Sequence, residues 1–220
     1  MKILSVSTSS NIASVAISED DKCILELNID NNKTHSETLM PLVSELFKKT
    51  NLNLSDINLI ACDVGPGSFT GIRIGIASIK AIAESVNVPV ISVTSLEALA
   101  YNIENIDCKT ICSLIDARNN QVYCGIFDKG YNLQEEYIAD DINVVIEVLN
   151  KYKNIVFIGD GAITHKDLLK IKDFTYENFI HSKNIAKCAY RKYIKGKLDN
   201  ADTIIPLYLR KSQAERMKKK

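Results

Sequence analysis

Short apolar runs and amphipathic stretches alternate along the first half of the chain. The first three runs are strand-like and are separated by Asn-rich turns. They span residues 2–7, 12–18 and 22–29. A helix is predicted next, at 36–50, because Thr34-His35-Ser36-Glu37 has the form of a capping box and apolar residues then recur at helical spacing. Pro41 inside that pattern predicts either a kink or a later helix start.

The rest of the chain continues with alternating strand and helix patterns. The predicted strands are 57–62, 89–93, 110–116, 121–127, 133–139, 154–158 and a weak one near 174. The predicted helices are 71–86, 95–104, 141–151, a short one near 164–170, and 183–196. Both halves then have the order β-β-β-α-β-α-β-α, which predicts an α/β protein of two lobes, each a mixed β-sheet flanked by helices. We expect residues 1–105, joined by the C-terminal segment 201–220, to form one lobe and residues 106–200 to form a smaller one.

Composition narrows the class of protein. The chain has 220 residues, of which 46% are hydrophobic and 25% charged, as in ordinary globular proteins. Lys and Arg number 27, as do Asp and Glu, so the basic excess typical of nucleic-acid binders is missing, although a local basic patch remains possible. No apolar stretch is long enough to cross a membrane, and the N-terminus lacks a signal-peptide pattern. The six cysteines are scattered without a Cys-x-x-Cys pair, which favours buried free thiols and the reducing cytoplasm.

The loop Gly65-Pro66-Gly67-Ser68-Phe69-Thr70-Gly71 is the strongest candidate for chemistry. A strand, a glycine-rich turn and a helix start together can bind an anion through backbone N–H groups and the positive helix end. The spacing matches neither common phosphate-binding fingerprint. The alternative is a tight connection in which Ser68 or Thr70 caps the helix. Arg73 lies in the first helical turn, where the helix dipole disfavours a cation, and an anionic neighbour would explain it.

The helix at 71–86 is apolar over most of its circumference, which predicts burial on more than one side. One reading makes it a central helix between the two lobes. The other makes it, together with 36–50, a docking surface in which Gly75 permits close approach of another backbone. The candidate interface residues are Leu39, Val43, Phe47, Ile72, Gly75, Ile76 and Ile79.

The remaining polar residues are weaker candidates for a functional site. None of His35, His165 and His181 has a second histidine at helical metal-ligand spacing, so no metal site is expected. Asp116 and Asp160 end strands beside turns, where they could hold hydrated magnesium or simply cap the turn.

Several segments together resemble the TsaB (YeaZ) family. They include Ile3-Leu4-Ser5-Val6-Ser7-Thr8-Ser9, the helix with His35-Ser36 and Leu39-Met40-Pro41, the stretch from Gly65 to Gly75, Ser95-Leu96-Glu97-Ala98-Leu99-Ala100, Asp116-Ala117-Arg118 with Val122-Tyr123, and Pro206-Leu207-Tyr208-Leu209-Arg210. The resemblance spans nearly the whole chain and implies an actin-like ATPase (ASKHA, ribonuclease H-like) fold. It also implies a dimerisation subunit of the bacterial complex that makes threonylcarbamoyladenosine in tRNA, with the catalytic paralogue TsaD and the ATPase TsaE as partners.

Two departures from the wider family bear on catalysis. The catalytic paralogue holds a metal through two histidines four residues apart, whereas here His35 is followed by Leu39. Proteins of this fold also tend to carry Asp in the first strand–turn, where this chain has Ser7. Both departures favour a subunit without catalytic residues or a tightly bound cofactor, with ATP or ADP and Mg²⁺ bound only within the complex.

Three hypotheses follow. The favoured one is a non-catalytic partner in threonylcarbamoyl transfer, touching tRNA through the complex and able to homodimerise when alone. The second is an autonomous kinase or ATPase of the actin-like fold. The third is an M22-type metallopeptidase.

Overall fold

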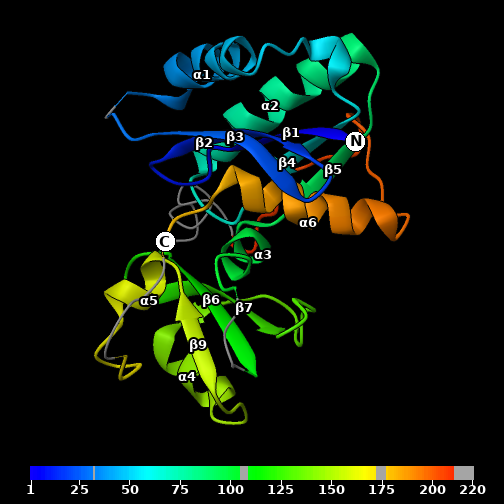
Figure 1. Cartoon of the computed structure of the whole chain (residues 1–220). Coiled ribbons are helices and arrows are strands. Elements are labelled where there is room, and N and C mark those ends of the chain that lie inside the picture. Colours follow the sequence, from blue (N-terminus) through cyan, green and yellow to red (C-terminus); the bar gives the residue numbers. More distant parts are fainter. Residues whose placement is uncertain (32, 105–108, 172–176, 211–220) are drawn as a thin grey trace. The chain divides into compact units, whose positions relative to one another are not determined.

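The computed structural model describes residues 1–31, 33–104, 109–171 and 177–210. The chain forms two compact units. The first unit comprises Met1–Ala98 and Ile180–Pro206, and the second comprises Leu99–Phe179 and the segment that begins at Leu207. Each unit is built on its own sheet (Figure 1).

The first unit contains a five-stranded mixed sheet in the order β3-β2-β1-β4-β5. Its strands are β1 (Lys2–Ser7), β2 (Ala13–Glu19), β3 (Lys22–Ile29), β4 (Leu59–Asp63) and β5 (Val90–Val93). The first three strands form an antiparallel meander, while β4 runs parallel to both β1 and β5. Strand β1 is thus central, and its residues from Ile3 to Ser7 are buried.

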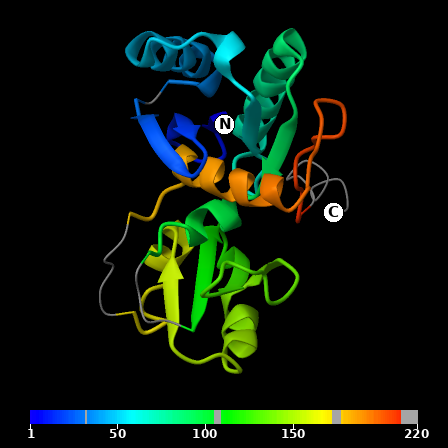
Figure 2. The same cartoon turned by 45° about the vertical axis from the view of Figure 1, so that its right-hand side comes forward.

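Helices cover both faces of this sheet. Helices α1 (His35–Thr50) and α2 (Phe69–Val86) lie side by side on one face, and α6 (Ser182–Ile194) lies on the other (Figures 1 and 2). The short helix η1 (Leu54–Asp56) also belongs to this unit, and α3 (Ser95–Ala100) begins in it and ends in the second unit. Helix α1 begins with the predicted capping box, in which the Thr34 N–H donates to Glu37 Oε2 at 3.1 Å, and Pro41 stands inside the helix.

The second unit contains a four-stranded sheet in the order β8-β7-β6-β9. Its elements are β6 (Thr110–Asp116), β7 (Gln121–Asp128), β8 (Ile138–Asp141), α4 (Ile142–Leu149), β9 (Ile155–Ile158) and α5 (Asp160–Thr164). Strands β6 and β7 form the predicted hairpin, and β9 runs parallel to β6. Its core packs α4 against the sheet through Ile142, Val145 and Leu149.

The C-terminal helix corrects the predicted lobe boundaries. Helix α6 was expected in the second lobe, but it packs on the first sheet. The first turn of α6 is fixed there by hydrogen bonds: the Ser182 N–H donates to Ser14 Oγ at 2.9 Å, and Ser5 Oγ donates to Ser182 O at 2.7 Å. Of the predicted C-terminal segment, residues 201–206 belong to the first unit, whereas the described residues 207–210 belong to the second.

Other differences concern element ends in the second half. Strand β8 begins at Ile138, later than predicted. Between β7 and β8 the Asp128 carboxylate accepts N–H groups from Gly130 and Asn132 and closes a turn. The short helix α5 begins at Asp160 and not near 164, directly after Gly159, whose φ of 104° suits glycine. The weak strand predicted near 174 falls outside the described residues.

Candidate functional site

The N-terminus of helix α2 is capped by groups of the same chain. Ser68 is its N-cap, and Ser68 Oγ accepts the Gly71 N–H at 3.2 Å. The Ser68 N–H donates to the carbonyl of Ser9 at 2.7 Å. Of the two predicted caps, Ser68 is therefore the one used, and Thr70 is exposed.

Three glycines of the loop and helix lie against the turn that follows β1. A Cβ on Gly71 would stand 1.9 Å from Thr8 O, and one on Gly67 would stand 2.3 Å from Ser9 O. A Cβ on Gly75 would stand 2.4 Å from Thr8 Oγ1. Thr8 Oγ1 also donates to Gly71 O at 2.7 Å, so a hydrogen bond joins the turn to helix α2 in addition to the close packing. The backbone that approaches this glycine row belongs to the same unit, and Gly75 is not free to receive a partner's backbone.

Asp63, at the end of β4, is a buried carboxylate surrounded by donors. Oδ2 accepts hydrogen bonds from the hydroxyls of Ser7, at 2.7 Å, and Ser9. Oδ1 accepts from Ser95 Oγ at 2.7 Å and from the Gly65 N–H at 2.9 Å. Burial raises the pKa of Asp63, while these four hydrogen bonds oppose that rise by favouring the charged form.

The same cluster explains why Ser7 replaces the acid expected from the fold. A carboxylate at position 7 would bring a second negative charge within hydrogen-bond distance of Asp63 in a site without solvent. Two buried like charges in contact disfavour ionisation of both. Position 7 therefore requires a donor, and the Ser7 hydroxyl supplies it.

These contacts favour the tight connection over a phosphate cradle at residues 65–71. The backbone of Thr8 and Ser9 occupies the space beside Gly67 and Gly71, where a phosphate would have to approach. The Gly65 N–H, a backbone donor that a phosphate would use, already donates to Asp63 Oδ1 at 2.9 Å. The residues at this position therefore do not fit a nucleotide phosphate.

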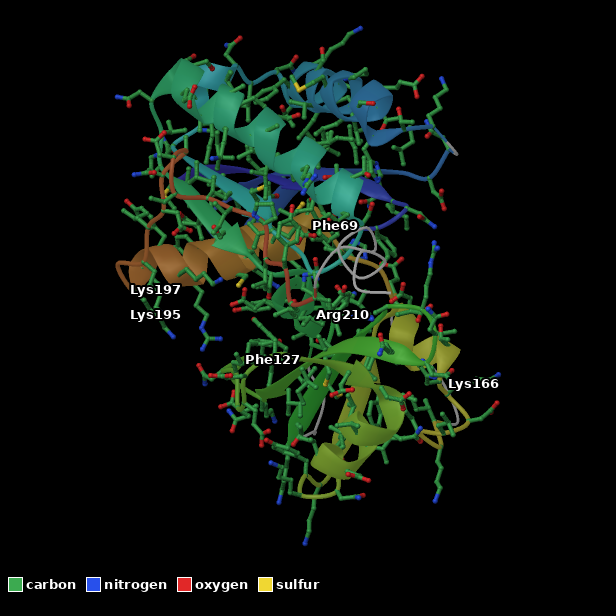
Figure 3. All side chains as sticks on the ribbon, turned by 180° about the vertical axis from the view of Figure 1, so that it is seen from behind. Phe69, Phe127, Lys166, Lys195, Lys197 and Arg210 are labelled. Carbon is green, nitrogen blue, oxygen red and sulfur yellow. The ribbon has the colours of Figure 1, made fainter. Side chains whose placement is uncertain are left out.

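Arg73 lies on the exposed side of α2 and interacts with an aromatic ring. Its guanidinium carbon is 5.1 Å from the centre of the Phe69 ring, a cation–π distance (Figure 3 labels Phe69). The negative face of the ring helps to offset the unfavourable position of a cation in the first turn. No anionic ligand is needed to explain Arg73.

Most of the predicted interface side chains belong to the core of the first unit. Leu39, Val43, Ile72, Ile76 and Ile79 are at most 5% exposed. Phe47 is half-buried. The apolar side chains of α1 and α2 that suggested a docking surface are therefore buried between these two helices and the sheet. The outward side of the helices instead presents Met40, 47% exposed, and the exposed residues Arg73, Ala77 and Ala81.

The second unit has its own polar turn, between β6 and β7. Asp160 Oδ1 accepts the Asp116 N–H at 3.0 Å, and Asp116 Oδ1 accepts the Arg118 N–H at 2.9 Å, so both carboxylates cap turns. Burial, with a smaller contribution from the neighbouring Asp116 charge, raises the pKa of Asp160. Arg210 Nη1 donates to Ala117 O at 3.5 Å and ties the C-terminal segment to this turn.

The histidines have structural contacts. His35 Nε2 is 2.7 Å from Ser10 O, and His181 Nδ1 is 2.8 Å from Glu26 Oε2. Burial raises the pKa of Glu26, but hydrogen bonds from His181 and the Lys183 N–H outweigh it, so the pKa lies below its ordinary value. His165 is buried in the second unit. Among the residues that the structure describes, no three His, Cys, Asp or Glu side chains gather as a metal site would require, and no helix is long and apolar enough to span a membrane.

Sequence reasoning missed the Asp63 cluster. Ser7 and Asp63 are 56 positions apart, so no local pattern joins them. The available signals were the serine-rich end of the first strand, Ser5 to Ser10, and one acid ending an otherwise apolar fourth strand.

Comparison with known proteins identifies the relatives of the chain. A family model described as TsaD, tRNA N6-adenosine threonylcarbamoyltransferase, matches residues 29–218. The tRNA threonylcarbamoyladenosine biosynthesis protein TsaB of Bacillus subtilis is 31% identical, over 98% of this chain and 96% of the relative. The protein of the same name from Haemophilus influenzae is 26% identical, over 96% of this chain and 94% of the relative. The structure of YeaZ from Pseudomonas aeruginosa superposes with a TM-score of 0.80 at 22% identity, covering 94% of this chain and all of that one. The predicted α/β actin-like fold is confirmed.

Proposed function

Because this chain belongs to the TsaB family, we propose that it is a partner subunit of the complex that transfers a threonylcarbamoyl group to the adenosine beside the anticodon of tRNAs reading ANN codons. The observation that carries the proposal is the end-to-end match to relatives named as tRNA threonylcarbamoyladenosine biosynthesis proteins TsaB. The match to the transferase family model supports a TsaD-type paralogue as the catalytic subunit. A TsaE-type ATPase is the further expected component, and the complex works in the cytoplasm, where its tRNA substrate is found.

The chain contributes a surface to this complex and not an active site of its own. The loop at 65–71 is filled by the turn at Ser7–Ser9, so phosphoryl chemistry there has no place for its substrate. Any ATP, ADP or Mg²⁺ that the reaction needs is bound within the complex. The kinase and metallopeptidase alternatives are not favoured, since the relatives that match from end to end are named for tRNA modification.

The docking face for the TsaD-type subunit is the outward side of α1 and α2. Arg73, Ala77 and Ala81 recur every four residues on α2 and are exposed, so they form one row. The two small alanines permit close approach of a partner helix, and Met40 of α1 adds an adaptable apolar contact. Leu39 and Ile76 hold the two helices on the sheet from below.

The test is binding of the TsaD-type transferase from the same organism, measured by calorimetry. Ala77→Arg should keep its thermal stability because position 77 is exposed, yet weaken binding by at least about 30-fold, the equivalent of the 2 kcal/mol of an interface hot spot. Val144→Arg is the matched control, since Val144 is 41% exposed on α4 of the second unit. Failure of the wild-type chain to bind the transferase would overturn the proposed function. Normal binding by both Ala77→Arg and Met40→Arg would place the docking face elsewhere.

A further inference from the structure

Charge is strongly segregated within the first unit. Residues 178–198 contain six Lys and Arg residues and no Asp or Glu, although the whole chain has equal numbers of both kinds. The six are Lys183, Lys187, Arg191, Lys192, Lys195 and Lys197. This segment is helix α6 and the turn that follows it. A cationic helix in a protein of zero net charge is the local basic patch that overall composition could not reveal.

The cations form a row on the side of α6 that faces away from its sheet. The inward side, with Ile185, Ala186 and Ala189, is buried. Four cations follow one another every four residues, which is about 6 Å per step along the helix axis. They are Lys183, Lys187, Arg191 and Lys195. We call these four, with Lys197 of the following turn, the basic ridge.

Exposure is greatest at the C-terminal end of the ridge. Lys195 and Lys197 are exposed and lie together at the end of α6 (Figure 3). Lys183, at the other end, is 43% exposed, and its Nζ is 3.8 Å from Glu26 Oε2. Lys187 and Arg191, between the two ends, are half-buried. Lys192 lies outside this row of every fourth residue, and its Nζ donates to Glu97 Oε2 at 2.8 Å and to Ser92 O at 2.9 Å.

Apolar side chains accompany the exposed cations. Ile194 is 64% exposed, Leu198 54% and Tyr193 39%. Nucleic-acid surfaces combine cations with aromatic or apolar side chains that pack on sugars and bases.

We propose that the basic ridge binds the phosphate backbone of the tRNA substrate. The proposal rests on the proposed function, which supplies tRNA as the polyanion. The ridge lies on the opposite face of the first sheet from α1 and α2 (Figures 1 and 2). A protein partner docked on α1 and α2 would therefore lie on the other face of the sheet from the ridge. Phosphate contacts of this kind position the RNA and carry no base specificity.

The experiment uses the complex of this chain with the TsaD-type transferase and a fluorescently labelled tRNA. Binding is followed by anisotropy between 50 and 200 mM KCl. In Lys195→Gln/Lys197→Gln, the slope of log K against log salt should become shallower by about 1.4–1.8, since each lost phosphate contact removes about 0.7–0.9. The dissociation constant at 50 mM KCl should rise several-fold. The matched control is Lys129→Gln/Lys166→Gln, which removes two exposed lysines of the second unit and should change neither quantity.

The possible outcomes separate this inference from the proposed function. An unchanged salt slope and affinity in an intact Lys195→Gln/Lys197→Gln complex would overturn the inference alone. Loss of transferase binding in that variant, with a normal wild-type complex, would also overturn it and would assign the ridge to a protein contact. If the wild-type chain forms no complex, the proposed function fails, and the inference that rests on it fails as well.

Discussion

The two units each have a turn after their first strand, and the two turns have opposite character. In the first unit, the turn after β1 is buried from Ser7 to Ser9. In the second unit, the turn after β6 is exposed from Arg118 to Asn120. Both turns join the first two strands of a sheet, and in both sheets the first strand pairs with a later parallel strand. The same position in the topology therefore carries two different surfaces.

The difference arises from what lies opposite each turn. Gly67 and Gly71 let α2 pack directly on the first turn, and the Asp63 cluster fixes it through hydroxyl groups. In the second unit the corresponding glycine, Gly159, packs against strand β6 itself, where a Cβ would stand 2.1 Å from Leu114 O. The turn beyond is exposed from Arg118 to Asn120. The comparison teaches that a glycine-rich strand–helix junction can serve internal packing alone.

The largest effect is expected where that packing is closest. Gly71→Ala would place a Cβ 1.9 Å from a backbone carbonyl, which cannot move without shifting β1. We expect a loss of about 3–5 kcal/mol in the free energy of unfolding, measured by urea denaturation. Gly130→Ala is the control, because a Cβ there meets only side-chain atoms, at 3.1 Å and beyond, and should cost less than about 1 kcal/mol. Equal stabilities of the two variants would show that the turn is not packed as described.

Asp63→Asn tests the serine cluster. The amide nitrogen of Asn donates and cannot accept, so donors on one side of position 63 lose their acceptor. We therefore expect a loss of about 1–3 kcal/mol in the free energy of unfolding. The raised pKa of Asp63 means that the folded protein holds the proton more tightly than the unfolded chain. The stability of the wild type relative to Asp63→Asn should thus decrease as pH rises from about the ordinary value of 3.8 through the raised pKa. Denaturation curves between pH 3.5 and 8 measure this difference in the free energy of unfolding between the two proteins. A difference that grows with pH would contradict the assignment.

Asp160→Asn makes the matching change in the open turn. The amide oxygen can still accept the Asp116 N–H, and one of two neighbouring carboxylate charges is removed. We expect a change of less than about 1 kcal/mol in the free energy of unfolding. A loss as large as that of Asp63→Asn would show that the two turns do not differ in the way the contacts indicate.

The smallest effect is expected in the exposed backbone of the second turn. Arg118 has a φ of 61°, which is costly for a residue with a Cβ. Arg118→Gly should stabilise the second unit by about 0.5–1 kcal/mol, because the relief of strain exceeds the entropy that glycine loses on folding. Arg118→Ala removes the same side chain without relieving the backbone and should not stabilise. Thermal unfolding distinguishes the two, and equal effects would refute the strain argument.

Local patterns predicted most of the elements, because capping boxes and apolar periodicity act within a few residues. The sequence did not predict the fold where one element could pack against either of two segments that are distant in the chain. Helix α6 has a small buried face, Ile185, Ala186 and Ala189, that could pack on either sheet. Helix α6 is fixed on the first sheet by the hydrogen bond from Ser5 of β1 to the Ser182 carbonyl and by that from the Ser182 N–H to Ser14 of β2. No local pattern reveals these two bonds.

The candidate site shows the same limit. The sequence identified the loop at 65–71 and the N-cap Ser68, but it could not show that Thr8 and Ser9 fill the space beside the glycines. Counting apolar residues on α1 and α2 also overstated the surface left for a partner. Side chains such as Val43 and Ile79 cover the sheet, so the outward row had to be read from the structure.

The most direct test of the central idea, a subunit that supplies a surface rather than an active site, is incorporation of labelled threonine into tRNA. The assay compares this chain alone, the TsaD-type transferase alone, and the two together with the remaining components of the reaction. Labelling should require both proteins, fall sharply with Ala77→Arg, and stay normal with Val144→Arg. Labelling of tRNA by this chain without the transferase, or full labelling by the transferase without this chain, would contradict the account.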